Sequence, residues 1–396
     1  MRSTSLNLRG VLGAAALLLS ATGVVSADGA AGDEKPATDL VDALRPTGLG
    51  CTLESIRVRP FGWVEASVST TPGLQASERS GRVFDVEKDG FRLHQAYFAV
   101  ERTPAEDRSF DLGGKVALLW GTDARFVHAQ GLGDEQTGEE QFDLLEAKLL
   151  ARFAVAHGLT VSLGKCTTPL GFEVIEAPNN LLVSRSFLFG YAIPFTHTGM
   201  IVSLGVSAQV KVSYGIVKGW DVVEDPNDAW TQLVGIAWTS PSKEDSITAN
   251  AILGAERPDN DRDLRGVVDA TWTHSFCGGL WTTTLNADFG FEQGAAPDGG
   301  DATWGGVAGY LTEKVCDGVL TTIRAEWFRD ADGTRLGEPA TLGDLVYGLD
   351  WTPFRRLPNL RVRPEARWDH SFDGKFFDDG RAHDQFSLTL DVLFTF

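Results

Sequence analysis

The chain ends on Gln385-Phe-Ser-Leu-Thr-Leu-Asp-Val-Leu-Phe-Thr-Phe396, a stretch in which polar and apolar residues alternate almost without exception. Successive side chains of a β-strand point to opposite faces, so this stretch predicts a strand with one apolar and one polar face. The apolar face carries Phe386, Leu388, Leu390, Val392, Phe394 and Phe396. A final strand of this kind is suited to a barrel in which the last strand pairs with the first.

The terminal phenylalanine indicates where in the cell the protein is located. An alternating segment that stops on phenylalanine resembles the C-terminal insertion signal of bacterial outer-membrane barrels, with Phe396 as its last residue. We therefore expect outer-membrane lipid and the barrel assembly machinery as partners of the chain in a Gram-negative-type envelope.

The N-terminus reads as an export signal. Arg2 and Arg9 precede or flank the apolar run Val11–Leu19, and Val25-Ser26-Ala27 has the small residues of a cleavage site. The domain prediction is a cleaved Sec-type signal peptide at 1–27, a mobile periplasmic lead-in at 28–55 and a barrel at 56–396. One helical turn is expected within the lead-in, at Thr38–Arg45.

Composition limits the remaining choices. No later run approaches the ~18 apolar residues of a membrane helix, whereas barrel strands are only half apolar. The formal net charge of −19 argues against nucleic acid as a partner. Forty-four glycines and two methionines favour a turn-rich, all-β protein.

Segments with a period of two continue along the whole chain after Gly50 and number sixteen, an even number as single-chain bacterial barrels have. They are Ile56–Ser69, Phe91–Arg102, Phe110–Thr122, Phe142–Val155, Leu159–Thr167, Thr196–Gly205, Ser207–Lys218, Trp230–Thr239, Ser246–Glu256, Leu264–His274, Gly279–Glu292, Thr303–Thr312, Val319–Asp330, Thr341–Thr352, Asn359–His370 and Asp384–Phe396. The predicted fold is a sixteen-stranded antiparallel transmembrane β-barrel with a long third external loop.

The connections between these segments alternate in length, as short periplasmic turns and long external loops do in outer-membrane barrels. Short connections include Thr103–Ser109, Ala156–Gly158, the single residue Val206 and Pro353–Pro358. Long connections include Thr70–Gly90, Asp123–Gln141, Thr168–Phe195 and Ser371–His383. A soluble β-sandwich has no reason to alternate in this way.

Ten of the eleven tryptophans fall near the predicted strand ends, where indoles gather at the two membrane interfaces. Trp120, Trp220, Trp230, Trp304, Trp327 and Trp368 lie at loop ends, and Trp238, Trp272, Trp281 and Trp351 lie at turn ends. A barrel of this width is wet inside, so the charged faces should line the lumen and the apolar faces should meet lipid.

The connection Thr168–Phe195 is the longest and the most apolar. In porins the third external loop folds into the barrel and narrows the channel. We therefore expect Glu173, Glu176 and Arg185 to project into the lumen as a constriction. The alternatives are a loop that caps the barrel mouth or one that makes a subunit contact.

Charged residues at inward positions are the candidate pore lining. The basic set is Lys115, Lys148, Arg152, Arg324, Arg361, Arg363 and Arg367, and the acidic set is Glu65, Glu146, Glu326, Glu365 and Asp369. Three arginines on one strand facing acids on the third loop would set up a transverse field that sorts polar solutes. The alternative is pairing within the wall, with Glu365 between Arg363 and Arg367 and Glu326 beside Arg324.

Several stretches resemble a known family. They are Phe91–Arg102, Gly121–Arg125, Gly164–Val174, Ser184–Phe189, Thr196–Gly199 and Gly219–Asp225. The chain is similar, over Ile56–Phe396, to the OmpL-like family of outer-membrane β-barrel porins. This resemblance implies a channel-forming porin and names no solute. Cys166 departs from the apolar or acidic residue usual at that position.

Four cysteines in an exported chain invite pairing. Cys277 and Cys316 lie in neighbouring periplasmic turns, so a Cys277–Cys316 disulfide is predicted; free thiols and a Cys51 partner are the alternatives. The seven histidines are scattered and show no catalytic or metal-ligand spacing. We expect no enzyme activity, no metal and no cofactor.

These observations predict a porin for passive diffusion of small hydrophilic solutes through a charged lumen. A homotrimer is expected only by analogy with porins. The first alternative function is an anion-selective channel of the phosphate type, suggested by the arginines. The second is a structural or adhesive surface barrel whose long acidic loops are the functional part.

Overall fold

The computed structural model describes residues 39–396 of the chain. The predicted signal peptide at 1–27 and the start of the lead-in lie outside the described residues. Within them, no helix is long and apolar enough to cross a membrane.

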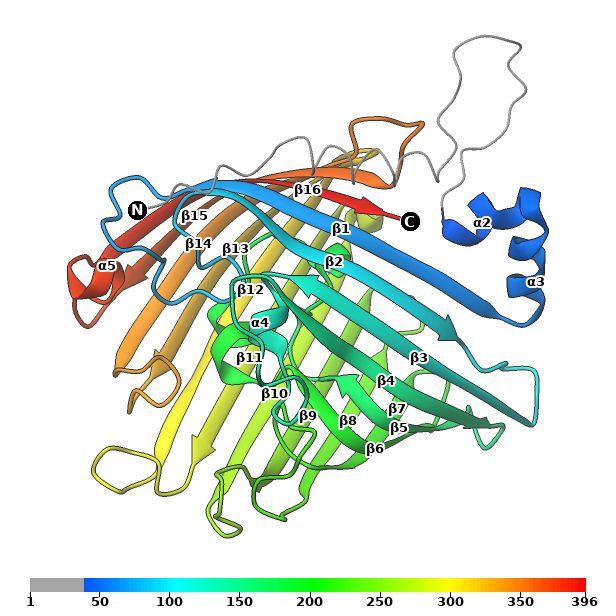
Figure 1. Ribbon diagram of the computed structural model, residues 1–396, viewed down its shortest axis with the longest axis horizontal. Helices are drawn as coiled ribbons and strands as arrows, with labels where there is room; N and C mark the ends of the chain where they lie inside the picture. The colour runs from blue at the N-terminus through cyan, green and yellow to red at the C-terminus, as the bar shows by residue number, and fades with distance from the viewer. Residues whose placement is uncertain (1–38) are drawn as a thin grey trace.

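The described residues form one closed antiparallel barrel of sixteen strands in which each strand pairs with its neighbours in sequence (Figure 1). The strands are β1 (Val58–Thr70), β2 (Gly90–Arg102), β3 (Phe110–Gly121), β4 (Gln141–Phe153), β5 (Leu159–Thr167), β6 (Thr196–Gly205), β7 (Val210–Val217), β8 (Thr231–Thr239), β9 (Asp245–Ala255), β10 (Leu264–Phe276), β11 (Trp281–Glu292), β12 (Ala302–Cys316), β13 (Val319–Asp330), β14 (Ala340–Trp351), β15 (Leu360–Ser371) and β16 (Asp384–Thr395). All sixteen predicted strands are confirmed, with ends that differ by a few residues.

The barrel closes between the first and last strands. Trp63 pairs with Thr395 and Ser67 with Asp391. Beyond β16, the backbone of Phe396 exchanges two hydrogen bonds of 2.9 Å with Gly62. The terminal phenylalanine therefore extends the seam and leaves no free sheet edge there.

The connections alternate in length as predicted. Those after odd-numbered strands include residues 71–89, 122–140, 168–195 and 218–230, and those after even-numbered strands are short. Two turns were placed wrongly. The β6–β7 turn spans 206–209 and is not Val206 alone, and β12 runs on to Cys316, so that only 317–318 join it to β13.

The two faces of the wall follow the alternation. On β16, Phe386, Leu388, Leu390 and Val392 are exposed on the outside, whereas Gln385, Ser387, Thr389 and Asp391 are buried on the inside. Exposed apolar side chains recur on the outer face of the other strands. This apolar outer surface is what a barrel in lipid requires.

The tryptophan prediction was partly wrong. Trp120, Trp230, Trp272, Trp327, Trp351 and Trp368 are exposed on the outer surface. Trp220 and Trp304 instead point inward and are 6 % and 2 % exposed, because they pack edge to face at the loop end of the interior. Arg335 lies over both rings, at 5.5 and 5.2 Å from their centroids.

The helices are short and lie in the segments that precede or connect the strands, with η2 and η3 in the third loop. They are α2 (Leu40–Leu44), η1 (Arg45–Thr47), α3 (Leu49–Ser55), α4 (Ala124–Val127), η2 (Ala177–Asn179), η3 (Leu188–Ala192), η4 (Cys277–Gly279) and α5 (Phe377–Gly380). Helices α2 and α3 lie beside the start of β1, at the end of the barrel with the short turns (Figure 1). The described part of the lead-in is therefore two packed helices, with Asp39 capping α2, where the sequence predicts a single helical turn.

The interior holds an apolar core formed largely by loops. Phe84, Phe189 and Phe195 come from two loops after odd strands and pack on one another with centroids 5.1–6.1 Å apart. They join inward-facing strand residues such as Phe328 in one buried cluster. The loop end of the barrel is therefore filled largely by its own loops.

Candidate functional site in the barrel lumen

The third loop, residues 168–195, lies inside the barrel. Its Phe172 N–H donates to Asn286 Oδ1 on β11 over 3.2 Å, and Trp304 Nε1 on β12 donates to the Ala192 carbonyl over 3.1 Å. Further contacts reach β13 and β15. The loop thus lies against the inner face of β11–β16, reaches Gln95 on β2 as well, and does not cap the mouth.

Two wall carboxylates hold the backbone of this loop. Glu365 on β15 accepts hydrogen bonds from the Val183 and Ser184 N–H groups over 2.7 and 3.1 Å. Glu326 on β13 accepts hydrogen bonds from the following segment of the loop. The Phe187 and Leu188 N–H groups each lie 2.7 Å from one of its oxygens. Neither carboxylate serves as the arginine partner that the sequence suggested.

Two of the predicted constriction residues hold the third loop in place, Glu173 against the wall and Arg185 within the loop itself. Glu173 pairs with Arg324 at 2.8 Å and accepts hydrogen bonds from Tyr310 Oη and the Ser186 N–H. Arg185 donates to carbonyls within the loop, including that of Val183 at 2.7 Å.

Glu176 lies 3.9 Å from Lys115, and burial raises the pKa of its carboxyl against the attraction of that lysine. Glu173, Glu176 and Arg185 are all less than a tenth exposed. The expectation that they project into the open lumen is therefore wrong.

The arginines of the predicted basic wall are mostly covered. Arg324 pairs with Asp344 at 2.8 Å, and Arg363 pairs with Glu65 and Asp391, each at 2.6 Å. Arg367 pairs with Asp369 at 2.6 Å and with Asp344 at 3.2 Å, and Arg361 pairs with Asp350.

Arg324, Arg363 and Arg367 are at most 1 % exposed, and Glu65, Glu146, Glu326, Glu365 and Asp369 are also buried. In contrast to the expectation, these groups do not face water. Burying so much charge is tolerable only because each group is paired or hydrogen-bonded.

The opposite half of the interior is open and mainly uncharged. A cavity of about 400 Å³ lies along the inner face of β4–β9. Its lining includes Glu101, Lys148, Thr160, Ser162, Cys166, Ser203, Lys211, Ser213, Thr248 and Asn250. Sequence reasoning missed the hydroxyl and amide groups because it followed charges. The signal was present in the alternation of Thr160 and Ser162 with apolar neighbours.

Three residues of the predicted basic set remain near this open half. Lys148 pairs with Glu146 at 2.5 Å, and Lys115 pairs with the same carboxylate at 2.9 Å. Arg152 donates to the Glu106 carbonyl near the turn end over 3.1 Å. All three are half-buried and keep partial access to water.

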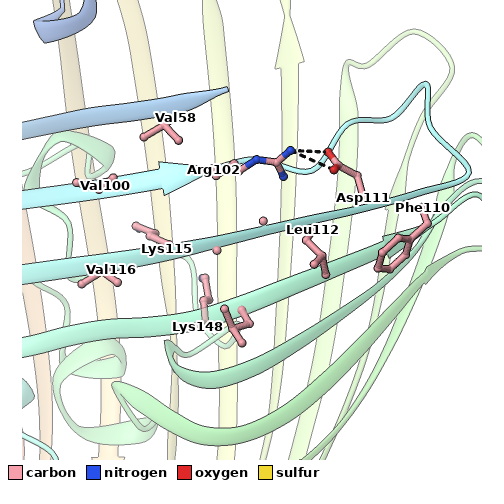
Figure 2. Close-up of a pocket in the computed structure, with 12 residues that line it drawn as sticks. Val58, Val100, Arg102, Phe110, Asp111, Leu112, Lys115, Val116 and Lys148 are labelled. Carbon is pink, nitrogen blue, oxygen red and sulfur yellow. Dashed lines mark hydrogen bonds and ion pairs between the residues drawn. The ribbon is translucent and has the colours of Figure 1, made fainter. Parts of the chain in front are cut away.

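A second cavity, of about 510 Å³, belongs to the outer surface and not to the lumen (Figure 2). It lies over β2–β4, where Gly113 and Gly114 lack side chains, and its rim includes the exposed Leu112, Val116 and Leu149. The Arg102–Asp111 ion pair, at 3.1 Å, closes its turn end (Figure 2). Its apolar rim faces lipid.

The structure also brings together a serine, a histidine and an aspartate. His94 Nε2 lies 2.7 Å from Ser67 Oγ, and His94 Nδ1 lies 3.3 Å from Asp123 Oδ1. All three are at most 5 % exposed, and none of them lines the cavities described above. A hydrolytic triad needs substrate access to its serine, so these residues form a buried hydrogen-bond network.

The predicted disulfide is not present. All four cysteines of the chain lie within the described residues and are free, including the exposed Cys277 and Cys316. Cys277 follows β10 and Cys316 ends β12, two strand spacings or about 10 Å apart, which exceeds the Cα separation of about 4.4–6.8 Å in a disulfide. Within residues 39–396, no three His, Cys, Asp or Glu side chains are grouped to hold a metal ion.

A family model described as "Putative beta-barrel porin-2, OmpL-like" matches residues 58–396. The chain belongs to this porin family. Membership in the OmpL-like porins agrees with the resemblance found in the sequence and places the barrel in the outer membrane. A search of curated proteins found no match.

Solved outer-membrane channels share the fold of this OmpL-like porin. The channel DcaP of Acinetobacter baumannii is 13% identical, with a TM-score of 0.58 over 86% of this chain and 97% of that one. The anion-selective porin from Comamonas acidovorans is 8% identical, with a TM-score of 0.60 over 86% and 99%. Pseudomonas putida OprB is 13% identical, with a TM-score of 0.58 over 88% and 97%.

Proposed function

We propose that this protein is a porin through which small hydrophilic solutes diffuse passively along the inner face of β4–β9. The observation that carries the proposal is the uneven interior. The third loop covers the charged half, whereas the other half keeps a cavity of about 400 Å³. Hydroxyl and amide groups along this path can replace water around a solute without holding it tightly.

Cysteine substitution along one strand tests the path. Ser162→Cys places a thiol in the cavity, whereas Leu163→Cys places it on the exposed outer face one residue away. A charged, membrane-impermeant thiol reagent should lower the single-channel current of the first variant and leave the second unchanged. Each variant also carries Cys166→Ser, so that the native thiol of the cavity does not react. Equal effects at both positions, or none, would refute this path.

The anion-selective channel remains the second candidate. Lys148 and Lys211 lie in the cavity lining, against the single carboxylate of Glu101. The Comamonas relative is described as anion-selective. Reversal potentials in a KCl gradient would measure the preference for anions. Block of the current by millimolar phosphate would then distinguish a phosphate-specific channel from a weakly anion-selective one.

A structural or adhesive barrel is the remaining alternative, and it predicts no conductance from a folded protein in a planar bilayer. We also propose that the barrel assembles as a homotrimer. A related fold, OmpT of Vibrio cholerae, is described in a trimer form. Chemical cross-linking in outer-membrane vesicles should then give a three-chain product, and a product of one chain alone would exclude it.

A further inference from the structure

Most buried carboxylates on the inner face of β11–β16, where the third loop lies, have an ion-pair or hydrogen-bond partner. Asp344, Asp369 and Asp391 pair with arginines. Glu326 and Glu365 accept backbone N–H groups of the third loop. Asp288 on β11 differs from all of these, because neither of its carboxylate oxygens has a hydrogen-bond partner within residues 39–396, and it is 5 % exposed.

A second carboxylate stands directly opposite Asp288. Asp269 on β10 is its register partner, and directly opposed residues hold their Cβ atoms about 4.5–5.5 Å apart. Asp269 is fully buried and accepts hydrogen bonds from the side-chain amides of Asn250 and Asn286, at 3.0 and 2.8 Å.

An additional oxygen without a partner lies on the same inner face. Thr271 is two residues after Asp269 on β10, and its buried Oγ1 has no hydrogen-bond partner among the described residues. Its register partner is Asn286. The group therefore offers two carboxylates and a hydroxyl, all hard oxygen ligands, with no arginine or lysine paired to either carboxylate.

We propose that Asp269 and Asp288, with Thr271 beside them, bind a hard divalent cation such as Ca²⁺. Two carboxylates buried side by side repel each other when both are ionised, so a counter-charge between them would be favourable, and oxygen ligands of this kind are those that Ca²⁺ takes. Water would complete the coordination.

The cation reaches the site from the lumen. Asn250, which donates to Asp269, also lines the cavity on β4–β9 and donates to the Pro169 carbonyl of the third loop over 3.0 Å. Cation binding at this point would tie the base of the loop to β9–β11. The proposal is independent of whether the lumen conducts, because it concerns a site that titration can detect in a closed barrel.

Calorimetric titration of CaCl2 into the folded, detergent-solubilised chain tests the site after removal of bound metal with EDTA. We expect one saturable binding event in the wild type and at least a tenfold loss of affinity in Asp288→Asn and Asp269→Asn. Asp317→Asn, at a highly exposed turn carboxylate, should bind as the wild type does. The isosteric variants remove an uncompensated charge and should fold, which the gel shift of the unheated barrel verifies.

Two results would overturn the cation site. One is a wild type that shows no saturable Ca²⁺ binding, or binding that both isosteric variants retain. The other is an infrared carboxylic acid band at neutral pH in saturating Ca²⁺ that disappears in Asp288→Asn. Such a band would show that the pair is held together by a shared proton.

Discussion

Glu173 on the third loop and Arg324 on β13 are 151 positions apart in the chain and form an ion pair of 2.8 Å inside the barrel. Arg324 also pairs with Asp344 and donates to the Ser184 carbonyl. It donates to the Arg185 carbonyl as well, so one wall arginine contacts four partners, three of them on the loop. The buried charges therefore decide where the loop lies and, through it, which half of the barrel stays open.

Glu173→Gln should loosen the third loop, because it removes the charge that pairs with Arg324 and replaces one of the two acceptor oxygens by an NH2 donor. Breaking a buried ion pair costs about 3–5 kcal/mol, and the remaining Arg324–Asp344 pair should keep the loss at or below that range. We expect a lower urea midpoint and a larger, noisier single-channel conductance. Glu135→Gln, at an exposed loop position, is the control. An unchanged conductance would show that the ion pair does not fix the constriction.

Glu365→Ala should release the segment around Val183. Two buried N–H groups would lose their acceptor, at about 1–3 kcal/mol each. Hydrogen exchange at Val183 and Ser184 should accelerate strongly, as mass spectrometry of peptides from the loop would show. Thr389→Ala is a matched control, because Thr389 is the register partner of Glu365 on β16 and is likewise buried. Equal protection in both variants would contradict the role of Glu365.

Reversing the cavity lysines should change ion preference. Lys148→Glu with Lys211→Glu replaces two positive charges on the proposed path by two negative ones. We expect the reversal potential in a KCl gradient to shift toward cation preference. Lys314→Glu, in an exposed position at the turn end, should shift it little. If Lys314→Glu shifts the reversal potential as much, per lysine replaced, as the double variant does, selectivity is set by the overall charge and not by this face.

The carboxyl of Asp221 should make stability depend on pH. It accepts hydrogen bonds from the Phe195 and Thr196 N–H groups, and burial raises its pKa to about 6. The folded state thus holds this proton more tightly than the unfolded state, so stability should fall as pH rises from about 4 to 6.

A shift of about two pKa units corresponds to at most about 3 kcal/mol. The difference in urea midpoint between the wild type and Asp221→Asn, measured from pH 4 to 7, isolates this contribution. A constant difference across that range would rule it out.

Alkylation should find all four cysteines unpaired. Cys51, Cys277 and Cys316 are exposed and should react with a maleimide in the folded barrel, whereas the buried Cys166 should react more slowly. Mass spectrometry of the labelled peptides, prepared without reductant, gives the number of alkylated cysteines. Recovery of a Cys277–Cys316 peptide pair would restore the disulfide that the sequence suggests.

The sequence alone determined the barrel, because a period of two is a local property that each strand carries by itself. The last twelve residues already state which side chains face lipid, and loop lengths identify the two ends. Charges at inward positions were also readable, including those of Arg363 and Glu365.

Only the tertiary structure decided what those inward charges do. Glu365 lies beside Arg363 and Arg367 in sequence, yet it holds the Val183 and Ser184 amides, and its neighbours pair with Asp391 and Asp369. Such pairings depend on how a loop folds against a wall more than a hundred residues away. No local pattern encodes that contact, because buried charges choose partners by distance and desolvation in the closed barrel.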